Sequence, residues 1–284
     1  MEVLSSRAAL RRYVASLKKK GKSIGFVPTM GYLHGGHLSL VRRSVRENGA
    51  TIASIFVNPL QFGPKEDFKS YPRAAARDKK MLRSAGCGAL FMPSAAEMYP
   101  EGFQTTVAVS ELAKPLCGKS RPTHFAGVTT VVSKLLNLVS PDRLYLGQKD
   151  FQQCRVLERM IEDLALPVEV RRVPIAREKD GLAMSSRNAR LTLEERRRAP
   201  ALYRALLEAR DLIAAGERNA SKVKKGLRRA LSLAGRGKTD YAEIVDSRTL
   251  KDVVKLKPNA EVLVAVAVFF SAARLIDNVV VRVP

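Results

Sequence analysis

The 284-residue chain has no tryptophan, only three cysteines and no hydrophobic run of membrane-spanning length. Its longest apolar run, Val262–Phe270, has the length of a strand, whereas a membrane helix needs about 20 residues. Cys87, Cys117 and Cys154 are far apart and form no CxxC pair, which argues against a disulfide framework and a zinc site. Met1–Lys20 is charged and amphipathic and lacks the hydrophobic core of a signal peptide. We therefore expect the protein in the reducing cytoplasm.

Acidic residues are scarce relative to basic ones. The 50 Lys and Arg residues exceed the 27 Asp and Glu residues, which gives a formal net charge of +23. Such an excess suits a polyanionic partner. The basic residues are nevertheless dispersed, form no tail and are not interleaved with aromatic residues. This dispersion favours a solvated basic surface over nucleic-acid binding as the main function.

Between residues 24 and 173, strand-like and helix-like segments alternate. Short β-branched or apolar runs predict strands at Ile24–Pro28, Thr51–Val57, Cys87–Met92, Thr105–Val109, Arg143–Leu146 and Val168–Val173. Helical periodicity predicts helices at residues 37–48, 73–85, 128–139 and 150–164. This alternation predicts an α/β fold with a doubly wound parallel sheet. Such sheets bind ligands at the carboxyl ends of their strands.

The pattern changes after about Ala176. Thr192 and Glu195 form a capping box, which marks a helix start, and apolar residues continue one helical face beyond it. A second helix and three strands are then expected, at Lys222–Leu233, Tyr241–Val245, Val262–Phe270 and Leu275–Val281. Helices followed by consecutive strands predict a smaller α+β domain. We therefore expect two domains, residues 1–176 and 177–284.

Two of the three histidines, His34 and His37, lie in Pro28–His37, at an expected strand-to-helix junction. A helix start offers anions free backbone N–H groups and the positive end of the helix dipole. Gly35 and Gly36 leave room for a ligand near the backbone, although adjacent glycines argue against a regular helix between the histidines. The alternative is a surface turn that contains two histidines. The position after a strand favours nucleotide binding.

The next polar residues follow a second expected strand. Asn58 and Gln61 carry amides that donate and accept hydrogen bonds at once, which suits a small hydroxy acid. Asn58 also stands before a proline, an ordinary way to start a turn. His124, the third histidine, is compatible with a structural, a substrate-gating or a catalytic role. No Ser/His/Asp triad is indicated.

Two later segments, Gly147–Gln153 and Met184–Asn188, suit a phosphate ligand. Lys149 supplies a point charge, and Gln153 lies one turn into the following helix. Asp150 is also a plausible N-cap of that helix. In the later segment two serines and an arginine form a compact phosphate clamp, although such runs are often ordinary loops. This clamp lies just past the expected domain boundary, where it could close over a ligand.

Five segments resemble, in their residues and order, the pantoate–β-alanine ligase family of the nucleotidylyltransferase superfamily. They are Pro28–His37, Ser54–Gly63, Arg121–Val128, Gly147–Gln153 and Asp180–Asn188, with a weaker likeness at Asp240–Asp246 and Arg274–Asn278. The resemblance implies a Rossmann-like domain followed by a smaller C-terminal α+β lid domain. It also implies ATP-dependent condensation of (R)-pantoate with β-alanine through a pantoyl adenylate, with release of AMP and pyrophosphate. Mg²⁺ is the implied cofactor, and family members are commonly homodimers.

The resemblance further implies roles for individual residues. The implied catalytic residues are His34, His37, Lys149 and Arg187, with His37 as the proton donor. Gln61 and Gln153 should hold pantoate, with Asn58 nearby. The implied ATP contacts are Met30, Gly31, Tyr32, Leu33, His34, Gly35, Gly36, His37, Gly147, Gln148, Lys149, Asp150, the backbone of Ala176, Met184, Ser185, Ser186 and Arg187.

Three places depart from the usual family pattern. Ile175-Ala176 differs from the usual Thr-Val, although a backbone contact would survive this change. Gly35 replaces an acidic residue often found between the histidines, and Arg77 replaces one often found before Asp78. The protein ligands of Mg²⁺ therefore remain unknown. A second hypothesis is a nucleotidylyltransferase that stops at an adenylated product, although its phosphorylated substrate would favour cations over amides at Asn58 and Gln61. A third is an RNA-binding relative of aminoacyl-tRNA synthetases, which a salt-dependent RNA shift assay would detect.

Overall fold

The computed structural model describes residues 1–64, 66, 68–233 and 238–284. These residues form two compact units. Unit 1 consists of residues 1–114, 121–148 and 153–174, and unit 2 consists of residues 115–120, 149–152 and 175–284. Two short segments that lie between parts of unit 1 in the sequence, 115–120 and 149–152, therefore pack with the C-terminal part of the chain.

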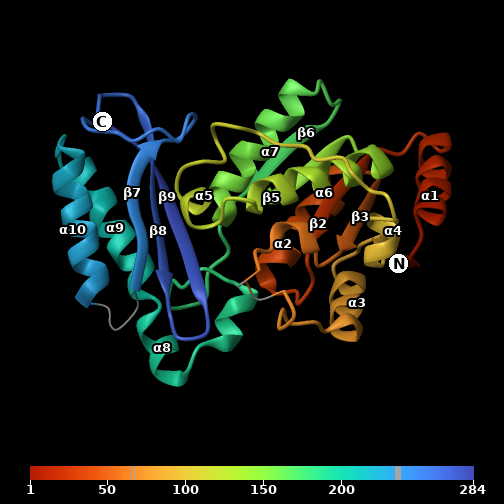
Figure 1. The fold of residues 1–284 in the computed structure, drawn as a ribbon, viewed down its shortest axis with the longest axis horizontal. Helices are drawn as coiled ribbons and strands as arrows, with labels where there is room; N and C mark the ends of the chain where they lie inside the picture. Colours follow the sequence, from red (N-terminus) through yellow and green to blue (C-terminus); the bar gives the residue numbers. More distant parts are fainter. Residues whose placement is uncertain (65, 67, 234–237) are drawn as a thin grey trace. The chain divides into compact units, whose positions relative to one another are not determined.

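Unit 1 is built on a parallel sheet of six strands in its described residues, in the order β1-β4-β3-β2-β5-β6, of which Figure 1 labels β2, β3, β5 and β6. Its strands are β1 (Glu2–Leu4), β2 (Ile24–Thr29), β3 (Ala50–Ile55), β4 (Ala89–Phe91), β5 (Arg143–Gly147) and β6 (Glu169–Val173). Every neighbouring pair is parallel. The predicted doubly wound parallel sheet is confirmed.

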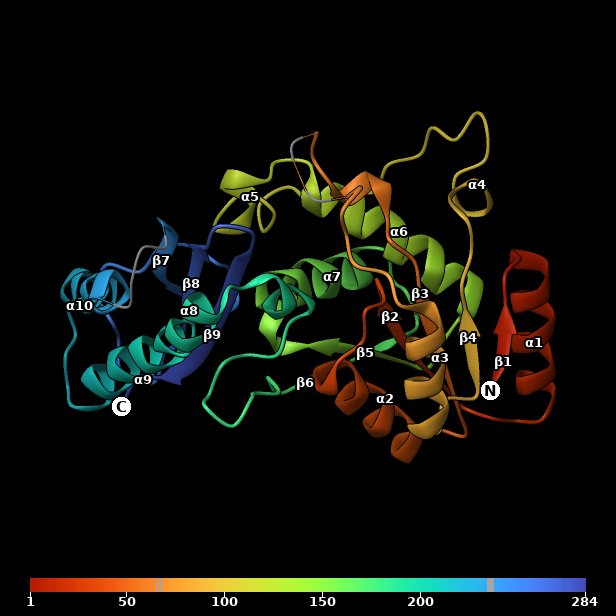
Figure 2. The same cartoon turned by 90° about the horizontal axis from the view of Figure 1, so that it is seen from below.

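Helices cover both faces of this sheet. They are α1 (Arg7–Lys19), α2 (Gly35–Glu47), α3 (Ala75–Ser84), α4 (Ala95–Met98), α6 (His124–Val139) and α7 (Phe151–Asp163). Figure 2 shows α6 and α7 above the sheet and α2 below it. Alternate strand residues supply the two cores: Phe26 packs with α1, α6 and α7, whereas its neighbour Val27 packs with α2 and α3. The period of two along each buried strand thus divides the apolar side chains between two layers.

Unit 2 contains an antiparallel sheet in the order β7-β8-β9, formed by β7 (Lys238–Asp246), β8 (Glu261–Phe269) and β9 (Arg274–Arg282). Its helices are α5 (Cys117–Ser120), α8 (Leu193–Arg198), α9 (Ala201–Ala214) and α10 (Ala220–Leu233). Leu206 of α9 and Leu227 of α10 pack with Val264 of β8 in one core, and Figure 1 shows both helices beside the sheet. The predicted α+β arrangement of this part is confirmed.

The helix start predicted at Thr192 is also confirmed. The Thr192 hydroxyl accepts the Glu195 N–H at 3.2 Å, and the Glu195 carboxylate accepts the Thr192 N–H at 2.9 Å. The single helix expected to follow is instead two helices, α8 and α9, and Pro200 precedes α9. A proline cannot donate the backbone hydrogen bond that would continue α8.

One predicted strand, Thr105–Val109, is wrong. These residues form no strand, and the Val107 N–H donates to the Thr130 hydroxyl of α6 at 3.0 Å. Val107 and Val109 pack against the core of unit 1, so their apolar character reflects burial beneath α6 rather than strand pairing.

Candidate active site

Three predicted segments of unit 1 follow adjacent strands. Residues 30–37 follow β2, residues 56–61 follow β3, and Gly147 ends β5. The chain runs outward from β2 through β3 to β4, and β5 and β6 lie on the other side of β2. The strand order therefore reverses between β2 and β5, where doubly wound sheets bind their ligands. The fold brings the histidine, amide and glycine segments of unit 1 to this edge.

The two histidines cap the start of α2. Nδ1 of His34 accepts the Gly36 N–H at 3.1 Å, and Nδ1 of His37 accepts the His34 N–H at 3.4 Å. A neutral imidazole whose Nδ1 accepts carries its proton on Nε2, so both rings are Nε2–H donors. Their centroids are 4.1 Å apart. The expectation that Gly35 and Gly36 disfavour a regular helix between the histidines is wrong, because reciprocal capping stabilises a helix that begins at Gly35.

Asp78, on α3, holds the loop between β2 and α2. Its carboxylate is 1% exposed and accepts the N–H groups of Tyr32 and Leu33, each at 2.8 Å. Gly31 and Tyr32 have φ values of +85° and +51°, in the left-handed region that a tyrosine adopts only with support. Arg77 donates to the Leu33 carbonyl at 2.9 Å, and its guanidinium lies 5.1 Å from the Tyr32 ring centroid. Sequence reasoning mentioned this pair only in connection with Mg²⁺.

The amide pair after β3 is buried and interconnected. Asn58 donates from Nδ2 to Oε1 of Gln61 at 3.1 Å and to the Gly127 carbonyl at 2.9 Å. The Tyr99 hydroxyl donates to Oδ1 of Asn58 at 2.8 Å, and burial raises the pKa of Tyr99 and keeps it protonated. Nε2 of Gln61 lies 3.2 Å from Sδ of Met30. Asn58 therefore orients Gln61, which in turn contacts the first residue of the histidine loop.

His124 supports the same turn from behind. It is buried, and its Nδ1–H donates to the Gln61 carbonyl at 2.9 Å. One turn later, a Cβ on Gly127 would lie 2.3 Å from the Leu60 carbonyl oxygen, so only glycine permits this approach of α6. The contact favours the structural role among those that the sequence left open for His124.

The segment after β5 begins with open backbone. Apart from Gly147 and its two chain neighbours, no described residue has a heavy atom within 4 Å of the position that a Cβ on Gly147 would take. The turn Gln148–Asp150 leads directly into α7, where Gln153 is half-buried. Lys149 and Asp150, which pack with unit 2, have their charged atoms 3.6 Å apart. The backbone carbonyl of Lys149 accepts a hydrogen bond from Asn278 at 3.0 Å.

In unit 2, a tight loop brings Ala176 beside the predicted phosphate clamp. The Met184 N–H donates to the Ala176 carbonyl at 2.9 Å, and Gly181, with φ +91°, forms the intervening turn. Ser185 then caps a short 3₁₀ helix, because its Oγ accepts the Arg187 N–H at 3.2 Å. The Ala176 backbone, predicted to contact ATP, and the residues predicted to bind phosphate thus belong to one compact loop.

The described residues contain no cluster of three or more His, Cys, Asp or Glu side chains that could hold a metal ion. The Asp78 carboxylate already accepts two backbone N–H groups. Such a site does not suit a metal that needs a complete cage of protein ligands. It suits Mg²⁺, which is usually held by substrate phosphates and water with few protein carboxylates.

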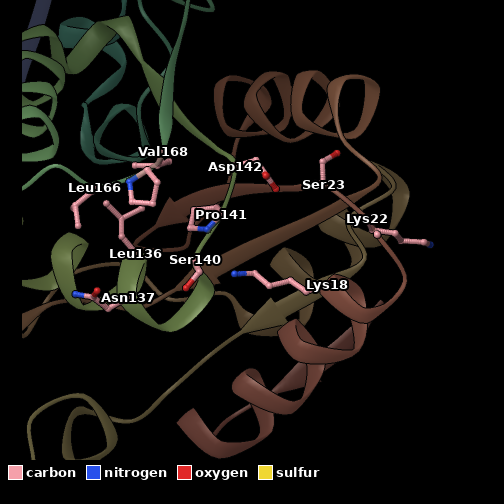
Figure 3. Close-up of a pocket in the computed structure, with 12 residues that line it drawn as sticks. Lys18, Lys22, Ser23, Leu136, Asn137, Ser140, Pro141, Asp142, Leu166 and Val168 are labelled. Carbon is pink, nitrogen blue, oxygen red and sulfur yellow. The ribbon is translucent and has the colours of Figure 1, made fainter.

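A cavity of about 560 Å³ lies at the opposite, amino-terminal edge of the parallel sheet (Figure 3). Ser23 precedes β2 and Asp142 precedes β5, and the ends of α1 and α6 complete the wall with Lys18 and Asn137. Its lining includes none of the predicted site residues. Parallel sheets bind ligands at the other edge, so this cavity is not the candidate active site.

A doubly wound sheet with a capped helix start at its strand reversal defines a nucleotide-binding α/β protein. Comparison with known proteins gives the particular family. The family model for pantoate-beta-alanine ligase matches residues 2–280. The chain is 52% identical over 283 residues to the pantothenate synthetase of Moorella thermoacetica, covering 100% of this chain and 99% of that protein. It is 53% identical to that of Caldicellulosiruptor saccharolyticus, covering 100% of both.

Solved structures agree with this match. The pantothenate synthetase of Thermus thermophilus has a TM-score of 0.92 and 48% identity, covering 98% of this chain and 99% of that one. The pantoate-beta-alanine ligase of Francisella tularensis, solved with beta-gamma ATP and beta-alanine, has a TM-score of 0.80 and 34% identity, covering 98% and 97%. The chain belongs to the pantoate–β-alanine ligase family.

As a member of this family, the enzyme joins pantoate to β-alanine in an ATP-dependent reaction, as the resemblance implied. The full-length match favours this activity over the two other hypotheses, a different nucleotidylyltransferase and an RNA-binding relative.

Proposed function

We propose that the reaction proceeds through pantoyl adenylate and that the residues predicted from the sequence carry it out. The histidine pair is the observation that carries the proposal. Two Nε2–H donors and the first N–H groups of α2 belong to one helix start at the strand reversal. The Francisella relative adds support, because its structure was solved with beta-gamma ATP and beta-alanine.

In the first step, a carboxylate oxygen of pantoate attacks the α-phosphorus of ATP. A C–O–P linkage forms, and the P–O bond to pyrophosphate breaks with its electron pair. Negative charge then accumulates on the phosphate oxygens, and His34, His37 and Lys149 donate hydrogen bonds to them. Positioning and charge stabilisation suffice, because this chemistry needs no covalent enzyme nucleophile. His37 is the proton donor to the departing pyrophosphate.

The remaining site residues hold the substrates. Gln61 and Gln153 bind pantoate, and Asn58 fixes the Gln61 amide next to it. The Arg187 guanidinium, which is permanently charged and has several N–H donors, binds the phosphates. The other ATP contacts are Met30, Gly31, Tyr32, Leu33, Gly35, Gly36, Gly147, Gln148, Asp150, Ala176, Met184, Ser185 and Ser186.

In the second step, the neutral amine of β-alanine attacks the activated carbonyl carbon. A C–N bond forms, the C–O bond to AMP breaks, and the nitrogen loses its proton to the AMP phosphate or to water. The acyl adenylate is sensitive to hydrolysis, so exclusion of water from the site protects it between the two steps.

Mg²⁺ is part of this proposal. When bound with ATP, it would neutralise phosphate charge and orient the triphosphate. Its ligands would be mainly phosphate oxygens and water, because the described residues contain no cluster of three metal-ligating side chains. Asp78 supports the neighbouring loop instead.

We also propose a homodimer in the cytoplasm, with residues 1–176 as the ATP- and pantoate-binding domain and residues 177–284 as a lid domain. The three cysteines, Cys87, Cys117 and Cys154, are buried and free. No described helix has the length and apolar character needed to cross a membrane. Sedimentation of the purified enzyme tests the dimer directly.

The adenylate is tested by isotope exchange. With pantoate present and β-alanine omitted, labelled pyrophosphate should enter ATP, because the first step is reversible and complete without the amine. Omission of pantoate should abolish the exchange. Exchange that requires β-alanine would show that no adenylate forms before the amine binds.

A further inference from the structure

Two consecutive polar residues of β9, Asp277 and Asn278, are almost completely buried. Their side chains are 3% and 4% exposed. Successive strand residues point to opposite faces of a sheet, so this pair reaches two different segments of unit 2. Burial of polar groups is costly unless they make hydrogen bonds, and both residues do.

Asn278 contacts the backbone from which Lys149 extends. Its Nδ2 donates to the Lys149 carbonyl at 3.0 Å, across 129 positions of sequence. The same short segment has a second anchor in Gln152, whose side chain accepts the Cys117 N–H at 3.0 Å and donates to the Pro115 carbonyl at 2.7 Å. The peptide that carries Lys149 is therefore fixed by the Asn278 side chain from outside its segment and by the Gln152 side chain from within it.

Asp277 fixes the loop of Ala176 and the phosphate clamp through Arg177. The Arg177 guanidinium makes two hydrogen bonds to the Asp277 carboxylate, at 2.7 and 3.0 Å, and a third to the Gly181 carbonyl at 3.0 Å. It also lies 3.4 Å from the ring centroid of Tyr203. Burial raises the pKa of Asp277, and the Arg177 charge opposes this shift. The Asp277 carboxylate and the Arg177 guanidinium thus stabilise each other's charged form.

We infer that Asp277 and Asn278 are positioning residues for adenylate formation. Asn278 acts through Lys149, and Asp277 acts through Arg177 and the loop from Ala176 to Arg187. The inference rests on the proposed roles of Lys149 and of this loop. Its physical basis is that small displacements of charged groups from a reacting phosphate lower the rate steeply.

A double-mutant cycle tests the Asn278 contact. In pantoate-dependent ATP–pyrophosphate exchange, N278A should be slower than the unmodified enzyme by about 10- to 100-fold. The exchange rate of the K149A/N278A double variant should be less than about twofold below that of K149A, because the group that Asn278 positions is already absent. The second half-reaction, measured with preformed pantoyl adenylate and β-alanine, should be little changed. If N278A fails to fold, N278L keeps the volume and removes the donor without adding a charge.

The Asp277 contact has a different signature. D277N should raise the KM for ATP by about 10-fold and change the KM for β-alanine little. If D277N fails to fold, R177Q/D277N, which removes both charges, replaces it with the same expected result. The control is E243Q on β7, because Glu243 pairs with Lys224 and Arg228 and not with the loop. E243Q should lower the melting temperature without changing either KM.

The outcomes separate this inference from the proposed function. A K149A enzyme with normal exchange would refute the role of Lys149 and with it the Asn278 inference. Slow exchange in K149A together with normal exchange in N278A would overturn the Asn278 inference alone. The same holds if the double variant shows the product of the two single losses. If N278A slows both half-reactions equally, Asn278 has only a structural role. If D277N, like E243Q, lowers the melting temperature without changing either KM, Asp277 has only a structural role.

Discussion

The two loops assigned to ATP are held in different ways. In unit 1, the loop of residues 30–37 is held directly, because Asp78 accepts two of its backbone N–H groups. In unit 2, the loop of residues 176–187 is held through an intermediary, because Asp277 binds Arg177, which donates to Gly181. Both buried carboxylates come from elements distant in sequence.

This difference predicts different sensitivity to substitution. The first loop contains the left-handed residues Gly31 and Tyr32, and the buried Asp78 carboxylate accepts the N–H groups of both Tyr32 and Leu33. The second loop also has its own backbone pairing, such as the Met184 N–H with the Ala176 carbonyl. Loss of one contact should therefore disturb the first loop more than the second.

The largest effect is expected for H37A, in the first loop. Adenylate formation should slow by about 10²- to 10³-fold, because a donor to the developing phosphate charge is lost. Pyrophosphate exchange measures this step. The control is S39A, which removes the Ser39 hydrogen bond to the Gly36 carbonyl and leaves both imidazoles in place. Normal exchange in H37A would exclude His37 from the chemistry.

D78N tests whether a buried carboxylate positions the first loop. Its amide cannot accept both N–H groups, and each unsatisfied buried group costs about 1–3 kcal/mol. Exchange should fall by up to about 100-fold. The matched control is D142N, because the Asp142 carboxylate accepts the Ile24 N–H at 2.7 Å at the amino-terminal edge. D142N should lower the melting temperature without slowing exchange. Equal losses of exchange rate in D78N and D142N would contradict the positioning role of Asp78.

A smaller effect is expected for R187A in the second loop. The catalytic efficiency with ATP should fall by about 10-fold, because one charged hydrogen bond to phosphate is lost while the loop keeps its backbone pairing. The efficiency with β-alanine in the second half-reaction should change little. R190A, in the same 3₁₀ helix, is the control. A loss as large as that of H37A would remove the contrast between the loops.

The smallest effect on activity is expected for E195Q, just after the second loop. Hydrogen bonds from the N–H groups of Ser271 and Thr192 lower the pKa of Glu195 from 4.5 to about 2. Its stabilisation is therefore complete above about pH 4.5 and is lost as the pH falls towards 2. E195Q should melt earlier than the unmodified enzyme at neutral pH, and the difference should shrink over this interval. E194Q is the neighbouring control, and a difference independent of pH would contradict this origin.

Sequence patterns predicted the parallel sheet because buried strands are continuous apolar runs separated by helical periodicity. They failed at Thr105–Val109, where Val107 and Val109 pack against the core of unit 1 without strand pairing. They also missed the short strand Glu2–Leu4, since three residues are too few to show a period. The histidine loop was recognisable because its residues are contiguous.

The residues that hold the site in place could not be predicted from local sequence patterns. Asp78 lies 46 positions from Tyr32, and Asn278 lies 129 positions from Lys149. An isolated aspartate or asparagine carries no local pattern that reveals such a partner. Asn58 was interpreted either as a turn residue or as a ligand, and the structure shows an amide that caps a turn and orients Gln61.

The amino-acid sequence alone determined the alternation of strands and helices, the capping box at Thr192 and the candidate residue types for a phosphate and a small hydroxy acid. These features depend on neighbours a few positions apart, so local periodicity and side-chain chemistry suffice to predict them. Only the tertiary structure decided which buried carboxylates and amides hold those residues in place. Such contacts join distant segments, and only packing of the completed sheets brings their donors and acceptors within hydrogen-bond distance.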